Sequence, residues 1–118
     1  MKTILSAVIA LSLLSCASTK SVVQPVGEWN YKITGTPNGD YSGLFIVIRD
    51  GDNYSATLTA SGNKIVFNEV KYASDTRKLT GYFYYDGNRI DFASTTEGDA
   101  MNGSVSAGGD SWPFKATR

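Results

Sequence analysis

Leu79–Phe92 has the sequence LTGYFYYDGNRIDF, and two other stretches repeat its pattern, Tyr54–Phe67 (YSATLTASGNKIVF) and Met101–Phe114 (MNGSVSAGGDSWPF). Each unit of 14 residues begins with a large apolar residue, has a small residue two positions later, and ends on Phe after a tight turn. The turns contain Ser-Gly, Asp-Gly or Gly-Gly, and such pairs tolerate the positive φ angles of two-residue hairpin loops. The repeat therefore predicts three β-hairpins.

Turn residues of the same kind divide the rest of the chain into further short segments, and no long segment has the helical period of 3.6 residues. We expect an all-β domain in which every connection is a hairpin, so that the strands form an up-and-down meander. Closure into a barrel is favoured because it removes both sheet edges; the alternatives are an open meander and a sandwich. The eight predicted strands are Val26–Thr34, Asp40–Arg49, Asp52–Ala60, Asn63–Tyr72, Arg77–Tyr85, Asn88–Thr96, Asp99–Ala107 and Asp110–Thr117.

The turns also predict the register of the strands. The three repeats place Phe67, Phe92 and Phe114 opposite small residues, Ala56, Gly81 and Gly103. With Asp50-Gly51 and Glu97-Gly98 as loops, Phe45 would face Ala56 and Phe92 would face Gly103. Small residues would then alternate with Phe in one layer, as they do inside small barrels.

The same alternation predicts which side chains point inward, and most of them are large. We therefore expect the barrel to be largely filled by aromatic side chains, with any pocket shallow and at a mouth lined by Tyr41, Tyr54 or Met101. The predicted inward residues are Trp29, Tyr31, Ile33, Tyr41, Phe45, Val47, Tyr54, Leu58, Ile65, Phe67, Leu79, Phe83, Ile90, Phe92, Met101, Val105, Trp112 and Phe114.

One segment breaks the alternation. If Ile65 and Phe67 point inward, strict alternation turns Glu69 inward and Val70 outward. A β-bulge near Asn68-Glu69 would return Val70 to the core, while the placement of Glu69 itself is left open.

The first residues indicate an address at the cell envelope. Lys2 precedes the apolar run Ile4–Leu14, which is too short to span a bilayer and is typical of a signal peptide. Residues 13–16, Leu-Leu-Ser-Cys, resemble the lipobox of bacterial lipoproteins, in which the Cys is lipidated after cleavage. We expect a signal peptide at 1–15, lipidated Cys16 with a tether at 16–25, and the barrel at 26–118. The alternative is an ordinary signal peptide followed by a free thiol.

Composition argues against several kinds of chemistry. The chain has no His and one Cys, which excludes disulfides and nucleophile–His pairs. Removal of residues 1–15 would take away Lys2, leaving 10 of the 11 basic side chains against 11 acidic ones, a balance unsuited to nucleic acid. Most acidic residues lie in turns, where Asp forms local hydrogen bonds. We therefore predict no enzymatic activity and no cofactor.

A metal site is also not expected, although the meander brings several turns to the end that carries both termini. The alternative is Ca²⁺, which needs converging carboxylate oxygens. The candidate ligands are Asp50, Asp52, Asp75, Glu97 and Asp99.

The outer face of the predicted strand 40–49 carries Leu44, Ile46 and Ile48 among polar neighbours. Such an aliphatic stripe could dock a protein partner, or Val22, Val23 and Val26 could fold over it. Tyr82 and Tyr84 form a second, weaker outer patch.

The opening Gly27-Glu28-Trp29 resembles the G-x-W start of lipocalins and avidins, which are eight-stranded calycin-like barrels. The whole domain is similar to small lipoproteins of Bacteroidota, which share G-x-W, the T-P-x-G-D of residues 36–40 and the P-F-x-A-T of residues 113–117. The resemblance implies an outer-membrane, periplasm-facing lipoprotein but no activity. We expect a binding module for a small apolar ligand or lipid; the alternative is a protein-interaction module, such as a hydrolase inhibitor or a structural envelope component.

Overall fold

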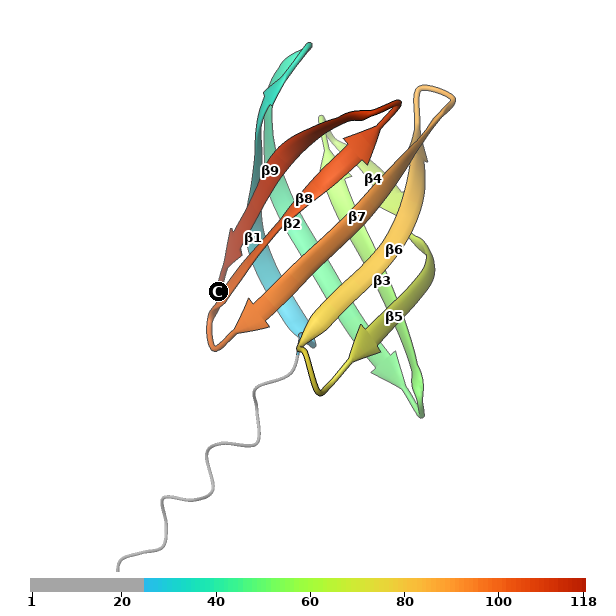
Figure 1. Cartoon of the computed structure of the whole chain (residues 1–118), viewed down its shortest axis with the longest axis vertical. Coiled ribbons are helices and arrows are strands. Elements are labelled where there is room, and N and C mark those ends of the chain that lie inside the picture. Colours follow the sequence, from blue (N-terminus) through green and yellow to red (C-terminus); the bar gives the residue numbers. More distant parts are fainter. Residues whose placement is uncertain (1–24) are drawn as a thin grey trace, which may run out of the picture.

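The computed structural model describes residues 25–118, which form antiparallel β-strands in one sheet (Figure 1). The predicted signal peptide, Cys16 and all but the last residue of the predicted tether lie outside the described residues. No helix in the described part of the chain is long and apolar enough to cross a membrane. The strands are β1 (Gly27–Thr36), β2 (Gly39–Asp50), β3 (Asn53–Ala60), β4 (Asn63–Val66), β5 (Asn68–Ala73), β6 (Lys78–Tyr85), β7 (Asn88–Glu97), β8 (Ala100–Ala107) and β9 (Asp110–Thr117).

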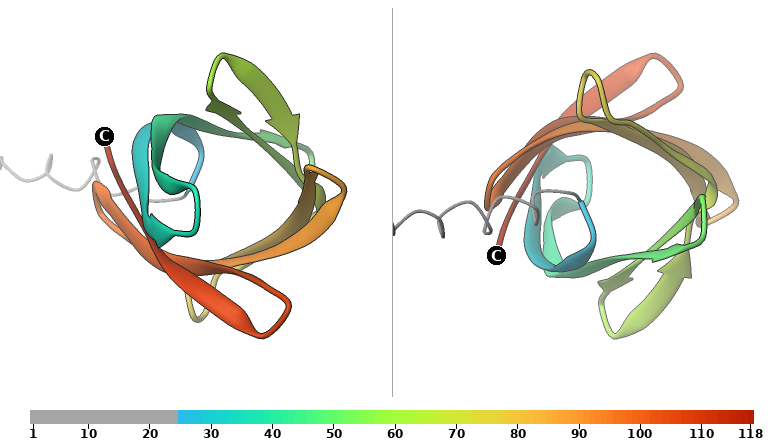
Figure 2. Two further views of the ribbon diagram at one scale, coloured as in Figure 1. Left: turned by 90° about the horizontal axis from the view of Figure 1, so that it is seen from above. Right: turned by 90° about the horizontal axis from the view of Figure 1, so that it is seen from below.

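The sheet curls into a nearly closed barrel (Figure 2). Its strand order is β4-β3-β2-β1-β9-β8-β7-β6-β5, so the first strand pairs with the last, with Ile33 opposite Phe114. The predicted all-β meander is therefore confirmed. The predicted number of strands is wrong, because residues 25–118 form nine strands rather than eight.

The additional strand arises where the sequence pattern breaks. The predicted strand 63–72 is divided into β4, which pairs with β3, and β5, which pairs with β6. Glu69 has a φ of 50°, its side chain is exposed, and the ladder shifts register between Asn68 and Lys71. Val70 consequently packs against the core, as the predicted bulge requires. Between β4 and β5, the amide of Phe67 donates a hydrogen bond of 2.9 Å to the carbonyl of Ala56 on β3.

Hairpin register follows the chemistry of each turn. In the three repeats the predicted pairs are present: Leu58 faces Ile65, Gly81 faces Phe92, and Gly103 faces Phe114. Both central residues of these turns have positive φ, as at Asp86 (53°) and Gly87 (79°), which is the type I′ pattern.

Two other hairpins correct the prediction. Phe45 faces Leu58 rather than Ala56, and Phe92 faces Val105 rather than Gly103. Here the loops are Gly51-Asp52 and Gly98-Asp99, and only the Gly has positive φ, as a type II′ turn requires. The register moves by two residues, which keeps the same side chains inside the barrel.

The core is densest toward the end that carries the start of β1 and the end of β9, the closed end. Phe45, Phe67, Phe92 and Phe114 form a cluster of rings, with neighbouring centroids 4.9 to 5.5 Å apart. Pro25 is fully buried, and its carbonyl accepts a hydrogen bond from Nε1 of the buried Trp29 at 2.9 Å. Two buried hydroxyls, of Ser94 and Thr96, have no hydrogen-bond partner.

Candidate functional site

The opposite half of the barrel holds a cavity of about 530 Å³. The cavity opens among the turns β1–β2, β3–β4, β6–β7 and β8–β9, which gather at the upper end of the barrel in Figure 1. The expectation of an interior filled by aromatic side chains is thus correct only for the closed half. The apolar part of the cavity wall consists largely of Ile33, Pro37, Leu58, Ala60, Ile65, Phe83, Ile90, Val105 and Ala107, with Trp112 near the rim.

Three tyrosines supply polar groups to this apolar wall, Tyr31 on β1, Tyr41 on β2 and Tyr85 on β6. The rings of Tyr41 and Tyr85 meet edge to face, with centroids 5.8 Å apart. A side-chain hydrogen bond with Tyr41, followed by burial, raises the pKa of Tyr85. The three phenols therefore lie close together in the cavity and form one tyrosine group.

Tyr31 is held by an interaction with β3. Its hydroxyl donates to the carbonyl of Thr59 at 2.6 Å, and Gly43 leaves the room for this contact, since a Cβ there would lie 2.5 Å from the same oxygen. Burial, with smaller contributions from Tyr85 and Tyr41, raises the pKa of Tyr31 to about 12. Tyr31 is therefore a neutral phenol whose donor is already engaged.

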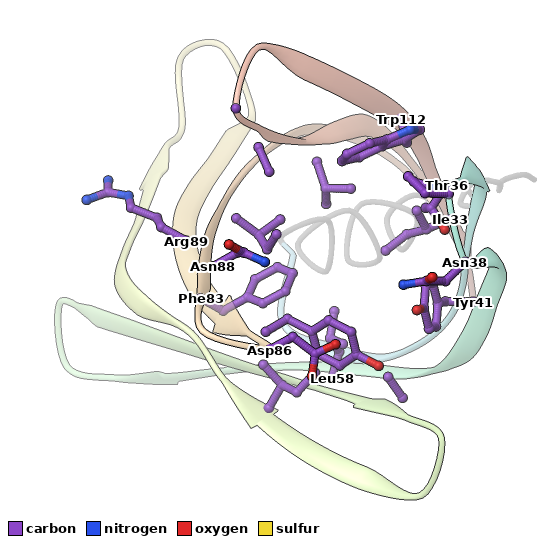
Figure 3. Close-up of a pocket in the computed structure, with 18 of the residues that line it drawn as sticks. Ile33, Thr36, Asn38, Tyr41, Leu58, Phe83, Asp86, Asn88, Arg89 and Trp112 are labelled. Carbon is purple, nitrogen blue, oxygen red and sulfur yellow. The ribbon is translucent and has the colours of Figure 1, made fainter.

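Of the described residues, only two with ionisable side chains other than tyrosines line the cavity, Asp86 and Arg89. Figure 3 shows Arg89 extending away from the cavity. Its guanidinium lies 3.8 Å from the ring centroid of Tyr82, and Nε lies 3.1 Å from Oδ1 of Asp91, both on the outer face. Asp86 lies close enough to Tyr85 to raise the pKa of that phenol further. Within residues 25–118, no positively charged side chain therefore points into the cavity.

The structure separates the three residues predicted to line a mouth. Tyr41 lines the cavity, and so do Pro37 and Asn38 of the protruding 36–40 loop. Tyr54 packs against Tyr72 near the closed end, with ring centroids 5.5 Å apart, and Met101 is fully buried. Tyr54 and Met101 are the second residues of β3 and β8, and both strands begin at the closed end.

The candidate calcium ligands do not come together. Among residues 25–118 no group of three or more His, Cys, Asp or Glu side chains is placed to hold a metal ion. Asp52 lies 3.9 Å from Arg49, Asp99 lies 3.4 Å from Arg118, and Asp75 accepts a hydrogen bond from the amide of Thr76. Asp50 and Glu97 are exposed at the ends of β2 and β7.

The outer stripe of β2 is present on the surface. Leu44 and Ile48 are exposed, Ile46 is half-buried, and Val66 on β4 extends the stripe across Thr57 with 61% of its surface exposed. Val26 is itself exposed, while Val22 and Val23 lie outside the described residues. Tyr84 is also exposed, and its ring meets that of Tyr82 edge to face at 5.8 Å.

Sequence reasoning missed Tyr85 and assigned Tyr31 to the core alone. Alternation provides the signal for Tyr85, because it lies two residues after the inward Phe83 and so faces the same side. Its position beside the Asp86-Gly87 turn places it at the rim rather than in the packed core.

The fold and cavity define a calycin-like β-barrel that is open at one end. Neither a protein-family model nor a curated protein sequence matches the chain. The barrel is similar to a fatty acid binding protein of Schistosoma mansoni, solved in complex with arachidonic acid, with a TM-score of 0.52 and 15% identity over 79% of this chain and 94% of that one. It is also similar to a variant of the fluorescent protein UnaG, with a TM-score of 0.47 and 17% identity over the same shares. At such identities the likeness concerns the fold.

Proposed function

We propose that the protein binds a small, mainly apolar molecule in the barrel cavity and does not catalyse a reaction. The observation that supports this most directly is the cavity itself, since 530 Å³ is within the range of about 300 to 1,000 Å³ typical of ligand pockets. Its wall combines many apolar side chains with a few convergent hydroxyls, the usual composition of such sites. The fatty acid bound by the Schistosoma protein supports the same use of the interior.

Ligand binding can be tested with the neutral apolar dye N-phenyl-1-naphthylamine, whose fluorescence rises in an apolar site. We expect saturable binding that is lost in Ala107→Trp, because Ala107 is half-buried at the cavity rim and an indole there would occupy the entrance. Ala73→Trp adds the same ring at an exposed position on β5 and should leave binding unchanged. Equal loss in both variants, or no saturable binding to the original protein, would refute the proposal.

We also propose that the chain is a lipoprotein anchored through Cys16 to the outer membrane and facing the periplasm. The lipobox-like residues 13–16 support this. Metabolic labelling with an alkyne fatty acid, followed by membrane fractionation, should give a labelled membrane protein, and Cys16→Ala should abolish both label and membrane association. Pro25 enters at the closed end, so the anchor would hold the cavity mouth on the side of the barrel away from the attachment.

Protein interaction is the second candidate function, and the exposed aliphatic stripe on β2 and β4 favours it. Ile48 and Val66 have 55% and 61% of their surfaces exposed, and Leu44 and Ile46 continue the stripe along β2. Native mass spectrometry of the protein purified from its own membrane distinguishes the two functions. A bound small molecule supports the first, whereas a bound protein that is lost in Ile48→Ser supports the second.

A further inference from the structure

The tyrosine group in the cavity allows the class of ligand to be specified, an inference that rests on the proposed binding function. A fatty acid is ionised at neutral pH, and burying a carboxylate is costly unless a cation or several donors compensate it. In residues 25–118 no cation points into the cavity, and its donors other than the tyrosines, on Asn38, Asn88 and Trp112, lie near the rim, where Asn38 and Asn88 are exposed. Arg89 is held outside by Tyr82 and Asp91, and the carboxylate of Asp86 lies near Tyr85.

The hydrogen-bonding capacity of the three phenols is limited and can be counted. Each phenol has one donor and can accept. The Tyr31 donor is engaged by the Thr59 carbonyl, which leaves the Tyr31 oxygen as an acceptor. The rings of Tyr41 and Tyr85 meet edge to face, with centroids 5.8 Å apart, and when one phenol donates to the other a single free O–H is left for a ligand. The group therefore presents one donor together with acceptors.

An alcohol group matches this arrangement, because a hydroxyl both donates and accepts. It could donate to the Tyr31 oxygen and accept from the free O–H of the Tyr41–Tyr85 pair. A carboxylate can only accept, so among the three tyrosines it would find a single donor, and it would face the phenol oxygens and Asp86. The apolar remainder of the cavity suits a hydrocarbon chain or ring system.

We propose that the cavity takes an uncharged lipid that carries a hydroxyl group, which hydrogen-bonds to Tyr31, Tyr41 and Tyr85, and that it discriminates against fatty acid anions.

Displacement of N-phenyl-1-naphthylamine from the purified protein at pH 8 by 1-decanol and by decanoate tests this discrimination. We expect half-displacement by decanol at a concentration at least tenfold lower than by decanoate. Because any apolar cavity disfavours an ion to some degree, a second comparison is needed. The double variant Tyr41→Phe/Tyr85→Phe removes the free O–H while keeping both rings. It should weaken the binding of decanol at least fivefold and leave the binding of 1-chlorodecane unchanged, because an alkyl chloride neither donates a hydrogen bond nor accepts a strong one.

The outcomes separate the two proposals. If the dye does not bind, or nothing displaces it, the proposed function fails. If the dye binds but decanoate displaces it as well as decanol does, only the ligand class is wrong. If the double variant affects decanol and 1-chlorodecane alike, the hydroxyl contact is refuted. Far-ultraviolet circular dichroism of the variant confirms that it is folded.

Discussion

The guanidinium of Arg118 lies over the indole ring of Trp29, with Cζ 4.1 Å from the ring centroid, and so links the last described residue to the first strand. The same guanidinium donates from Nη1 to the carbonyl of Val26 at 2.6 Å and from Nη2 to the carbonyl of Gly98 at 3.2 Å. It thereby joins β1, the β7–β8 turn and the end of β9. These contacts close the end of the barrel opposite the cavity.

Arg118→Met should therefore destabilise the barrel. The side chain is only 18% exposed, and a cation–π contact together with charged hydrogen bonds contributes about 2 kcal/mol in such a place. Arg89→Met is a matched control, because Arg89 also lies over a ring and beside a carboxylate but is 55% exposed. Urea denaturation should show a clear loss of unfolding free energy for the first variant and almost none for the second. Equal effects would contradict this role of Arg118.

Gly103 on β8 has no room for a side chain. A Cβ there would lie 2.0 Å from the carbonyl oxygen of Ala93 and 2.5 Å from Cα of Ser94, and neither backbone atom can move independently. We expect Gly103→Ala to lower the unfolding free energy by more than about 2 kcal/mol. Gly81→Ala tests whether the effect is specific to Gly103. A Cβ at Gly81 would lie 3.2 Å from its nearest neighbour, the carbonyl oxygen of Asn68. This substitution should therefore lower the unfolding free energy by less than about 1 kcal/mol. Thermal or urea unfolding that ranks the two variants in the opposite order would be inconsistent with this packing.

The sequence allowed the meander and its inner face to be predicted, because both depend on local turn chemistry and on alternation. The type I′ turns also gave the correct pairing of Gly81 with Phe92. The type II′ turns did not, since Gly98-Asp99 and Glu97-Gly98 are both plausible loops, and the choice moves the register by two residues without changing the inner face.

The cavity could not be predicted in the same way. Whether a barrel is filled depends on the volumes of the inward side chains at each level along the barrel axis. Alternation predicts which side chains point inward, but it does not predict how their volumes are distributed between the two ends. Phe92 and Phe114 meet in the closed half with centroids 4.9 Å apart, whereas Ile33, Ile65 and Ile90 leave space in the open half. Tyr41 lines the cavity, and its contact with Tyr85 joins β2 and β6, which are far apart in sequence, so local pattern could not predict it.

Thr96 on β7 is 1% exposed, and its hydroxyl has no hydrogen-bond partner. Because an unsatisfied buried hydroxyl is costly, the isosteric Thr96→Val should raise the unfolding free energy by about 1 kcal/mol. Thr95→Val, on the exposed face of the same strand, provides the control and should have little effect on a denaturation curve. A loss of stability in Thr96→Val would instead indicate that a buried water satisfies the hydroxyl.

Stability should also fall at alkaline pH because of Tyr31. The pKa of this phenol is about 12 in the folded protein, against 10.0 for an unperturbed tyrosine, mainly because of its burial. Between these values the folded state keeps a proton that the unfolded state loses, so the unfolding free energy decreases as pH rises from 10 to 12. A shift of this size corresponds to about 2 to 3 kcal/mol.

Urea denaturation at pH 8 to 12 should show this decrease, and Tyr31→Phe should make it shallower, because the variant lacks the titrating group. Tyr72 and Tyr85, whose pKa values are also raised, would account for the part that remains. The variant also leaves the Thr59 carbonyl without its donor, so its stability at pH 8 should already be lower by about 1 to 3 kcal/mol. A slope identical to that of the original protein would show that Tyr31 ionises normally and that its hydroxyl is not held in the buried contact with Thr59.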